Sequence, residues 1–76
     1  MQARNKHHSV KSFQENASWT NKDGLYGWKH FRIVGRRYDA EKQLEIELMS
    51  ICDKAVRFWR PSSELKKSDS WHEGWL

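Results

Sequence analysis

A strict alternation of apolar and polar residues between Gln43 and Ile51 is the feature that most limits how this chain can fold. The alternating positions are Leu44, Ile46 and Leu48 on one side and Glu45, Glu47 and Met49 on the other. Successive side chains of a β-strand point to opposite faces of the sheet, so this pattern is that of a strand with one buried face. We therefore expect the core of the protein to lie on one face of a β-sheet.

Two further segments, residues 28–38 and 55–60, show the same periodicity on either side of the first. Their apolar residues at alternate positions are Phe31, Ile33, Val56 and Phe58. Short polar segments at 39–42 and 52–54 connect neighbouring strands and suit hairpin turns. These three strands are expected to pair in the order in which they occur along the chain.

Shorter elements complete the predicted fold. Residues 18–20 are consistent with a short extra strand, and residues 62–67 follow Pro61 as one helical turn with a serine at the N-cap. Residues 71–75 are expected to fold back over the sheet. The predicted fold is mainly β: an antiparallel meander of three to four strands, either open or curled into a small barrel, with one short helical turn near the C-terminus.

Aromatic residues are unusually frequent for such a polar chain. The 76 residues suffice for one small domain; only 37% of them are hydrophobic and the net charge is +4, yet there are five Trp, three Phe and two Tyr. Disordered chains are poor in aromatic residues, so we expect most of the chain to fold, with tryptophan as its main stabilising residue. We interpret residues 1–17 as a flexible basic N-terminal arm and residues 18–76 as a small aromatic-rich β domain.

Several classes of protein are disfavoured by what the sequence lacks. No apolar run approaches the ~20 residues that span a bilayer, and the N-terminal segment has no apolar region typical of a secretory signal. The single cysteine, Cys52, excludes an internal disulfide and fits a reducing cytoplasm. The histidines and Cys52 lack metal-ligand spacing, and no phosphate-binding glycine loop or nucleophile with a positioned base is present. We expect a cytoplasmic protein that is not an enzyme and has no metal, cofactor, membrane contact or small-molecule substrate.

The predicted strand 28–38 is basic and contains no acidic residue. Its charged residues are Lys29, Arg32, Arg36 and Arg37. In the simplest hairpin register Arg36 lies opposite Glu45. Arg32 then lies within reach of Glu47, so one interpretation is that both arginines form ion pairs on a solvated face. The cations left for phosphate groups would be Lys29, Arg37, Arg57, Arg60 and those of the N-terminal arm.

The tryptophans allow two interpretations. Trp71 and Trp75 either cover the open edge of the core or form a partly exposed aromatic platform. Trp59 is the tryptophan that we expect to be exposed, because it alternates with the inward-facing residues of its strand. With Arg57 and Arg60 it would form a compact recognition patch, unless the C-terminal tail covers it.

An ordered set of short motifs resembles a known family. The motifs are Ser18-Trp19-Thr20, Gly27-Trp28-Lys29-His30-Phe31, Cys52-Asp53 with Val56-Arg57-Phe58-Trp59, Glu64-Leu65, and Trp71 with Gly74-Trp75. Together they resemble, over residues 18–75, the small tryptophan-rich proteins of unknown function found mainly in cyanobacteria and in some proteobacteria. Family members often have a lysine where this chain has Ser18. The resemblance implies a bacterial cytoplasmic protein with a shared small fold, and it implies no activity.

The sequence thus favours a non-catalytic binding module that docks on RNA or a ribonucleoprotein. Lys29, Arg37, Arg57 and Arg60 are the residues expected to contact phosphate, and Trp59 is expected to stack on a base. The alternative function is that of a protein–protein adaptor or assembly factor. In that case the exposed tryptophans would be the main contacts of a protein complex.

Overall fold

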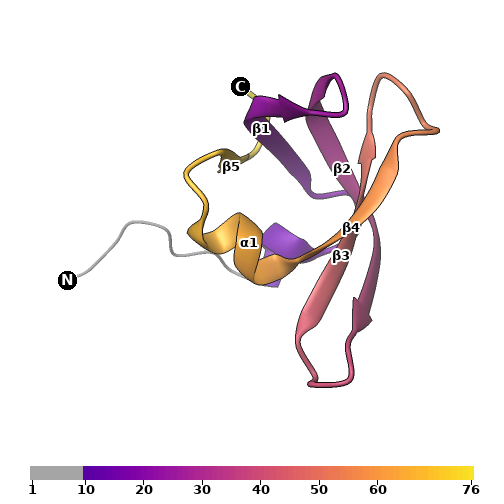
Figure 1. Ribbon diagram of the computed structural model, residues 1–76, viewed down its shortest axis with the longest axis vertical. Helices are drawn as coiled ribbons and strands as arrows, with labels where there is room; N and C mark the ends of the chain where they lie inside the picture. Colours follow the sequence, from indigo (N-terminus) through magenta and orange to yellow (C-terminus); the bar gives the residue numbers. More distant parts are fainter. Residues whose placement is uncertain (1–9) are drawn as a thin grey trace.

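The alternating segments form neighbouring strands of a single antiparallel sheet. The computed structural model describes residues 10–76 (Figure 1). Its elements in chain order are the 3-10 helix η1 (Val10–Phe13), β1 (Ser18–Leu25), β2 (Trp28–Tyr38), β3 (Leu44–Ser50), β4 (Arg57–Pro61), α1 (Ser62–Lys67) and β5 (Trp71–Glu73). The five strands lie in the order β4-β3-β2-β1-β5 across the sheet. The mainly β, antiparallel fold predicted from the sequence is therefore confirmed.

The first four strands form the predicted meander, and the fifth is added at its far side. After β4 the chain passes through α1, which packs on one face of the sheet, and returns to lie beside β1 (Figure 1). Residues 71–73 consequently extend the sheet at its edge as β5, rather than folding over its face. Strands β4 and β5 stand at opposite edges and do not pair, so the sheet is open and the small barrel does not form.

A β-bulge in β2 changes the predicted register between β2 and β3. Ile33 pairs with Leu48, but the next pair joins Gly35 to Glu47, which leaves Val34 as the extra residue. The predicted pairing of Arg36 with Glu45 is therefore wrong. Arg36 lies opposite Ile46, and Arg37 takes the position opposite Glu45.

The core lies on the face of the sheet that carries α1. Its buried apolar residues are Phe13, Trp19, Phe31, Ile33, Ile46, Leu48, Leu65 and Trp71. Of the inward-facing residues predicted by the alternation of β2 and β3, Phe31, Ile33, Ile46 and Leu48 are among them, and Leu44 is only partly buried. The two C-terminal tryptophans behave differently, since Trp71 is buried and Trp75 is 46% exposed.

The packed part of the protein begins before the predicted boundary at residue 18. Phe13 is buried and stacks on Trp19 with 5.4 Å between ring centroids, and the Trp19 indole N–H donates to the carbonyl oxygen of Ser12 at 2.7 Å. The backbone of Asn16 and Ala17 exchanges hydrogen bonds with Ile33. Residues 12–17 of the expected arm therefore contact the sheet, and residues 1–9 lie outside the described residues.

The helix α1 has the predicted bounds but not the predicted N-cap. Pro61 occupies the N-cap position, and no side chain caps the helix there. Tertiary contacts hold the helix instead: Leu65 is buried in the core, and the Trp71 indole N–H donates to the Glu64 carboxylate at 3.2 Å. For so short a helix, packing is the main source of stability.

Replacement of Phe13 by alanine tests whether η1 belongs to the folded domain. Removing a buried phenylalanine ring typically costs about 3–5 kcal/mol. A chain of this length has a total stability on the order of 4–11 kcal/mol. Phe13→Ala is therefore expected to lower the free energy of unfolding, measured by urea titration, by a large share of its total.

A control variant lies one residue further along the chain. The Gln14 side chain is exposed, so Gln14→Ala is expected to change the free energy of unfolding by less than about 0.5 kcal/mol. Equal unfolding midpoints for the two variants would contradict the packing of η1 against Trp19.

Candidate functional site

The face of the sheet away from α1 carries most of the polar and basic strand residues, and we call it the outer face. Two cross-strand rows define it: Arg32, Met49 and Arg57 in one, and Gly35, Glu47 and Trp59 in the other. Alternation along each strand places these rows opposite the core residues. The adjoining pair Arg37 and Glu45 extends the outer face toward the β2–β3 turn.

The C-terminal residues cover the β1 side of the outer face. The Trp75 indole N–H donates to the Phe31 carbonyl oxygen at 3.2 Å, and the Leu76 backbone N–H donates to the Thr20 hydroxyl at 3.2 Å. His30 Nε2 lies 2.9 Å from the Leu76 carbonyl oxygen. These contacts explain why Trp75 is only half exposed.

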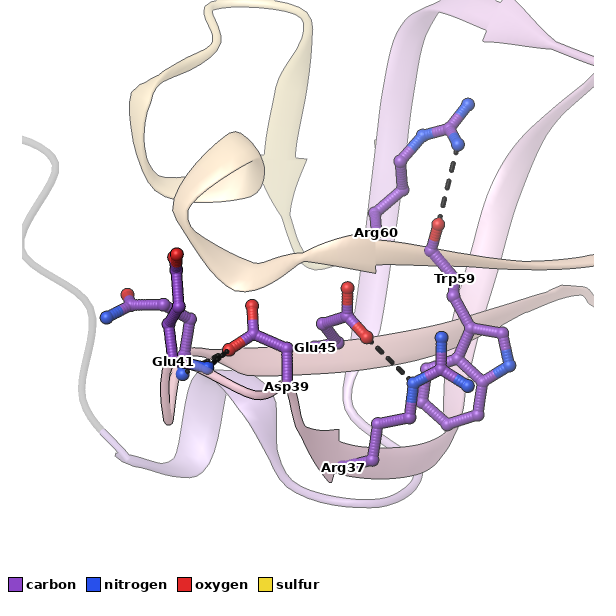
Figure 2. Close-up of polar contacts among 7 residues, drawn as sticks. Arg37, Asp39, Glu41, Glu45, Trp59 and Arg60 are labelled. Carbon is purple, nitrogen blue, oxygen red and sulfur yellow. Dashed lines mark hydrogen bonds and ion pairs between the residues drawn. The ribbon is translucent and has the colours of Figure 1, made fainter.

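A stack of Arg37 on Trp59 lies on the uncovered part of the outer face. The Arg37 guanidinium carbon is 3.9 Å from the centroid of the Trp59 ring, a distance typical of a cation–π contact (Figure 2). Its Nε donates to Glu45 Oε1 at 2.7 Å, while the Arg37 side chain remains 53% exposed. One cation is thereby held in a fixed orientation by an aromatic ring and a carboxylate. Its two terminal nitrogens form no ion pair within residues 10–76.

The absence of a side chain at Gly35 makes room for this stack. A Cβ atom at Gly35 would lie 2.9 Å from Glu47 Oε1, 3.2 Å from Glu47 Cβ and 3.2 Å from Cη2 of Trp59. The indole therefore extends from β4 across β3 and covers the bare backbone of β2, an arrangement known for aromatic residues beside strand glycines. The bulge that ends at Gly35 also turns Arg37, rather than Arg36, toward the indole.

Arg57 and Arg32 are the other two cations of the outer face. Arg57 is exposed, and its Nε donates to the Lys54 carbonyl oxygen at 3.2 Å. The Arg32 guanidinium lies 5.8 Å from the Trp75 ring. Neither arginine forms an ion pair with any carboxylate in the described part of the chain, so both positive charges are available to a ligand.

The predicted patch of Arg57, Trp59 and Arg60 is divided between the two faces of the sheet. Arg60 alternates with Trp59 and leaves β4 on the opposite side (Figure 2). There its guanidinium lies 5.0 Å from the Phe58 ring and 3.5 Å from the Glu64 carboxylate. Arg60 also donates to the Tyr26 hydroxyl at 3.5 Å. Arg60 thus belongs to the core side of the sheet.

Lys29 is separated from the stack in a different way. It lies on β2, eight residues before Arg37. At roughly 3.3 Å per residue the two lie about 26 Å apart along the strand. Of the five residues predicted from the sequence, the structure brings together Arg37, Trp59 and Arg57 on one face, and it leaves out Lys29 and Arg60.

Sequence reasoning missed Arg32 and the role of Glu45. It expected Glu45 to bind Arg36 and Arg32 to form an ion pair, because it assumed an unbroken register. Gly35 was the available signal, since an isolated glycine inside a strand often marks a bulge. A bulge placed there would have turned Arg37 toward Glu45.

Other kinds of site have little support in the described residues. No cluster of three histidine, cysteine or acidic side chains suited to a metal ion occurs in residues 10–76. Cys52 is exposed. Within the same range no helix combines the length and apolarity needed to cross a bilayer.

Replacement of Gly35 by alanine tests the geometry of the stack. The added methyl group must displace Glu47 and the Trp59 ring, and such overpacking costs about 1–3 kcal/mol. We expect a lower free energy of unfolding in urea. We also expect the upfield ring-current shift of the Arg37 side-chain protons to be lost in NMR spectra.

Gly27→Ala provides the matched control. Gly27 has a φ of +87° and no atom within 4 Å of its Cβ position, so alanine there strains the backbone without touching Trp59. The Arg37 resonances should then keep their shifts. An unchanged Arg37 spectrum in Gly35→Ala would show that the stack does not depend on the bare glycine.

Comparison with known proteins identifies the family of the chain. A family model described as tryptophan-rich protein (DUF2389) matches residues 17–76, which include every strand and α1. No curated protein and no solved structure matches the chain. The motifs that suggested the resemblance lie on or beside β1, β2, β4, α1 and β5, and the matched range also includes β3. The chain therefore belongs to the tryptophan-rich DUF2389 family, whose function is unknown.

Proposed function

We propose that this protein is a non-catalytic binding module that docks on single-stranded RNA, free or within a ribonucleoprotein, through its outer face. The observation that carries this proposal is the Arg37–Trp59 stack, a partly exposed guanidinium fixed 3.9 Å above an indole. In this proposal the protein acts in the bacterial cytoplasm and catalyses no reaction.

The stack has the chemistry that single-stranded RNA requires. Unstacked bases bind on aromatic rings and on arginine guanidinium planes, whatever their sequence. One side of the Arg37 plane rests on the indole, which leaves the other side for a base. Glu45 engages only Nε, so the terminal nitrogens of Arg37 are free to donate to a phosphate oxygen.

The neighbouring charges favour a polyanion over a neutral ligand. Arg32 and Arg57 lie on the same face, one row away from Trp59, and neither is neutralised by an ion pair within residues 10–76. The whole chain carries a net charge of +4, which favours association with a polyanion. The proposed interface therefore consists of Arg32, Arg37, Arg57 and Trp59, without the Lys29 and Arg60 of the predicted set.

Binding of a fluorescent 20-nucleotide oligouridylate, measured by anisotropy, tests the proposal. Each phosphate neutralised on a single strand contributes about −0.7 to the slope of log K against log salt. Three arginine contacts therefore predict a slope of about −2 and a roughly 20-fold loss of affinity between 50 and 200 mM salt. Stacking of a base is worth about 1–3 kcal/mol, so Arg37→Gln is expected to weaken binding by about 10-fold or more.

Lys67→Gln is the matched control, because it removes one positive charge from the exposed surface of α1. It should leave the affinity within about twofold of the parent value if α1 does not face the RNA. Absence of binding at 50 mM salt would refute the proposal. Equal losses of RNA affinity in Arg37→Gln and Lys67→Gln would show that net charge alone attracts the RNA. That result would refute the proposed interface.

The adaptor function remains a second proposal, carried now by Trp75 alone. Trp71 is buried, and Trp59 lies under the Arg37 guanidinium, so neither offers a free indole to a protein. Trp75 is 46% exposed beside Arg32, a pairing of residue types frequent in protein interfaces. A pull-down from native lysate with and without nuclease separates the two functions, since only an RNA-dependent partner is lost on nuclease treatment.

A further inference from the structure

The free edge of β4 is the strongest feature of the molecule that the outer-face interface does not use. β4 is the last strand of the sheet on its side, so one row of its backbone groups has no partner strand. The Ser50 N–H donates to the Val56 carbonyl oxygen at 3.0 Å, so the backbone groups of Val56 point toward β3. By alternation, Phe58 and Arg60 direct their backbone groups toward β3, and Arg57, Trp59 and Pro61 direct theirs outward.

The outward row is open to another strand. Pro61 has no N–H, and its position in the outward row is the one that proline can occupy at a sheet edge. The Trp59 carbonyl oxygen accepts only a long bond of 3.4 Å from the Arg60 guanidinium (Figure 2). An incoming N–H can replace that weak contact. The N–H and carbonyl groups of Arg57 and Trp59 therefore offer an added strand two residues of ladder bonding.

A cavity of about 370 Å³ lies beside this edge on the core side of the sheet. It is lined by Tyr26, Ala55, Val56, Arg57 and Phe58. The rings of Tyr26 and Phe58 stand 5.0 Å apart between centroids, so the wall is aromatic. A strand edge beside a side-chain pocket is the arrangement by which proteins capture extended peptides, with main-chain bonds for affinity and the pocket for selectivity.

We propose that the β4 edge binds an extended acidic peptide of a partner protein as an additional strand, with one aromatic side chain of the peptide in the cavity lined by Tyr26, Val56 and Phe58. Charge determines the kind of peptide. Arg57 and the adjacent Lys54 are exposed, and Arg57 has no carboxylate partner within residues 10–76. β4 itself contains two arginines and no acid, so two copies of this basic edge repel each other and an acidic strand is attracted. The proposed peptide site shares the Arg57 side chain with the proposed RNA interface and otherwise uses the backbone edge of β4 and the cavity.

The test uses the whole chain, labelled with 15N, and the capped peptide acetyl-Thr-Glu-Phe-Glu-Thr-amide. As a strand, this peptide presents phenylalanine on the core side and both glutamates on the side of Arg57. We expect the amide resonances of Arg57 and Trp59 to move downfield and to become protected from exchange, because only they gain a hydrogen bond. The inward-facing amides of Phe58 and Arg60 should be much less affected.

Two substitutions and one peptide variant probe the individual contacts. Ala55→Phe fills the cavity and Arg57→Glu reverses the charge at this edge. Each substitution is expected to lower the affinity for the peptide by about 10-fold. Replacing the peptide phenylalanine by alanine should have a similar effect. Arg36→Glu is the control, because this exposed arginine on β2 carries the same charge change away from the edge, and it should alter binding by less than about twofold.

Specific results would overturn the proposal. These are no amide shifts at about 1 mM peptide, or shifts without the alternation between Arg57, Trp59 and their neighbours. Protection of the same two amides in the protein alone, with a dimer mass in solution, would assign the edge to a second copy of the chain. Shifts confined to arginine side chains, reproduced by the oligouridylate, would assign it to RNA.

Discussion

The burial of Trp19 is the contact on which the rest of this structure depends. Its indole is fully buried where β1 meets β2 on one side and β5 on the other, since Trp19 pairs with Phe31 and with Glu73. η1 covers the ring through Phe13, and the indole N–H is satisfied by the Ser12 carbonyl oxygen. One side chain therefore ties together the N-terminal segment, the central strand and the last strand. In a domain with no disulfide this cross-linking by packing replaces a covalent link.

The sequence was most informative where structure is local. The alternation in 43–51 correctly predicted that Ile46 and Leu48 are buried, because strand periodicity and burial of one face determine each other. The bounds of β2 and α1 were predicted correctly for a similar reason, since turn residues and Pro61 mark them. The contribution of η1 was missed because it depends on a contact between Phe13 and the sheet that no local pattern reveals.

The candidate site was predicted only in part, and the reason is geometric. Alternation correctly separated Trp59 from Phe58, yet the same rule places Arg60 with Phe58, so a patch built from consecutive residues could not form on one face. Lys29 and Arg37 lie near opposite ends of the same strand. The stack of Arg37 on Trp59 required the bulge at Gly35, and a one-residue shift in register changes which of two adjacent arginines meets a given partner. Such shifts are set by tertiary packing.

The bulge also gives the adjacent arginines Arg36 and Arg37 a form of redundancy. Before the bulge Arg32 pairs with Met49, and this register, if continued, would pair Arg36 with Glu45. After the bulge the register has moved by one residue, and Arg37 pairs with Glu45. If β2 and β3 paired without the bulge, the earlier register would continue and the first arginine of the doublet would face Glu45. An arginine therefore meets this glutamate in either register. The doublet makes the pairing with Glu45 tolerant of a one-residue slip between β2 and β3.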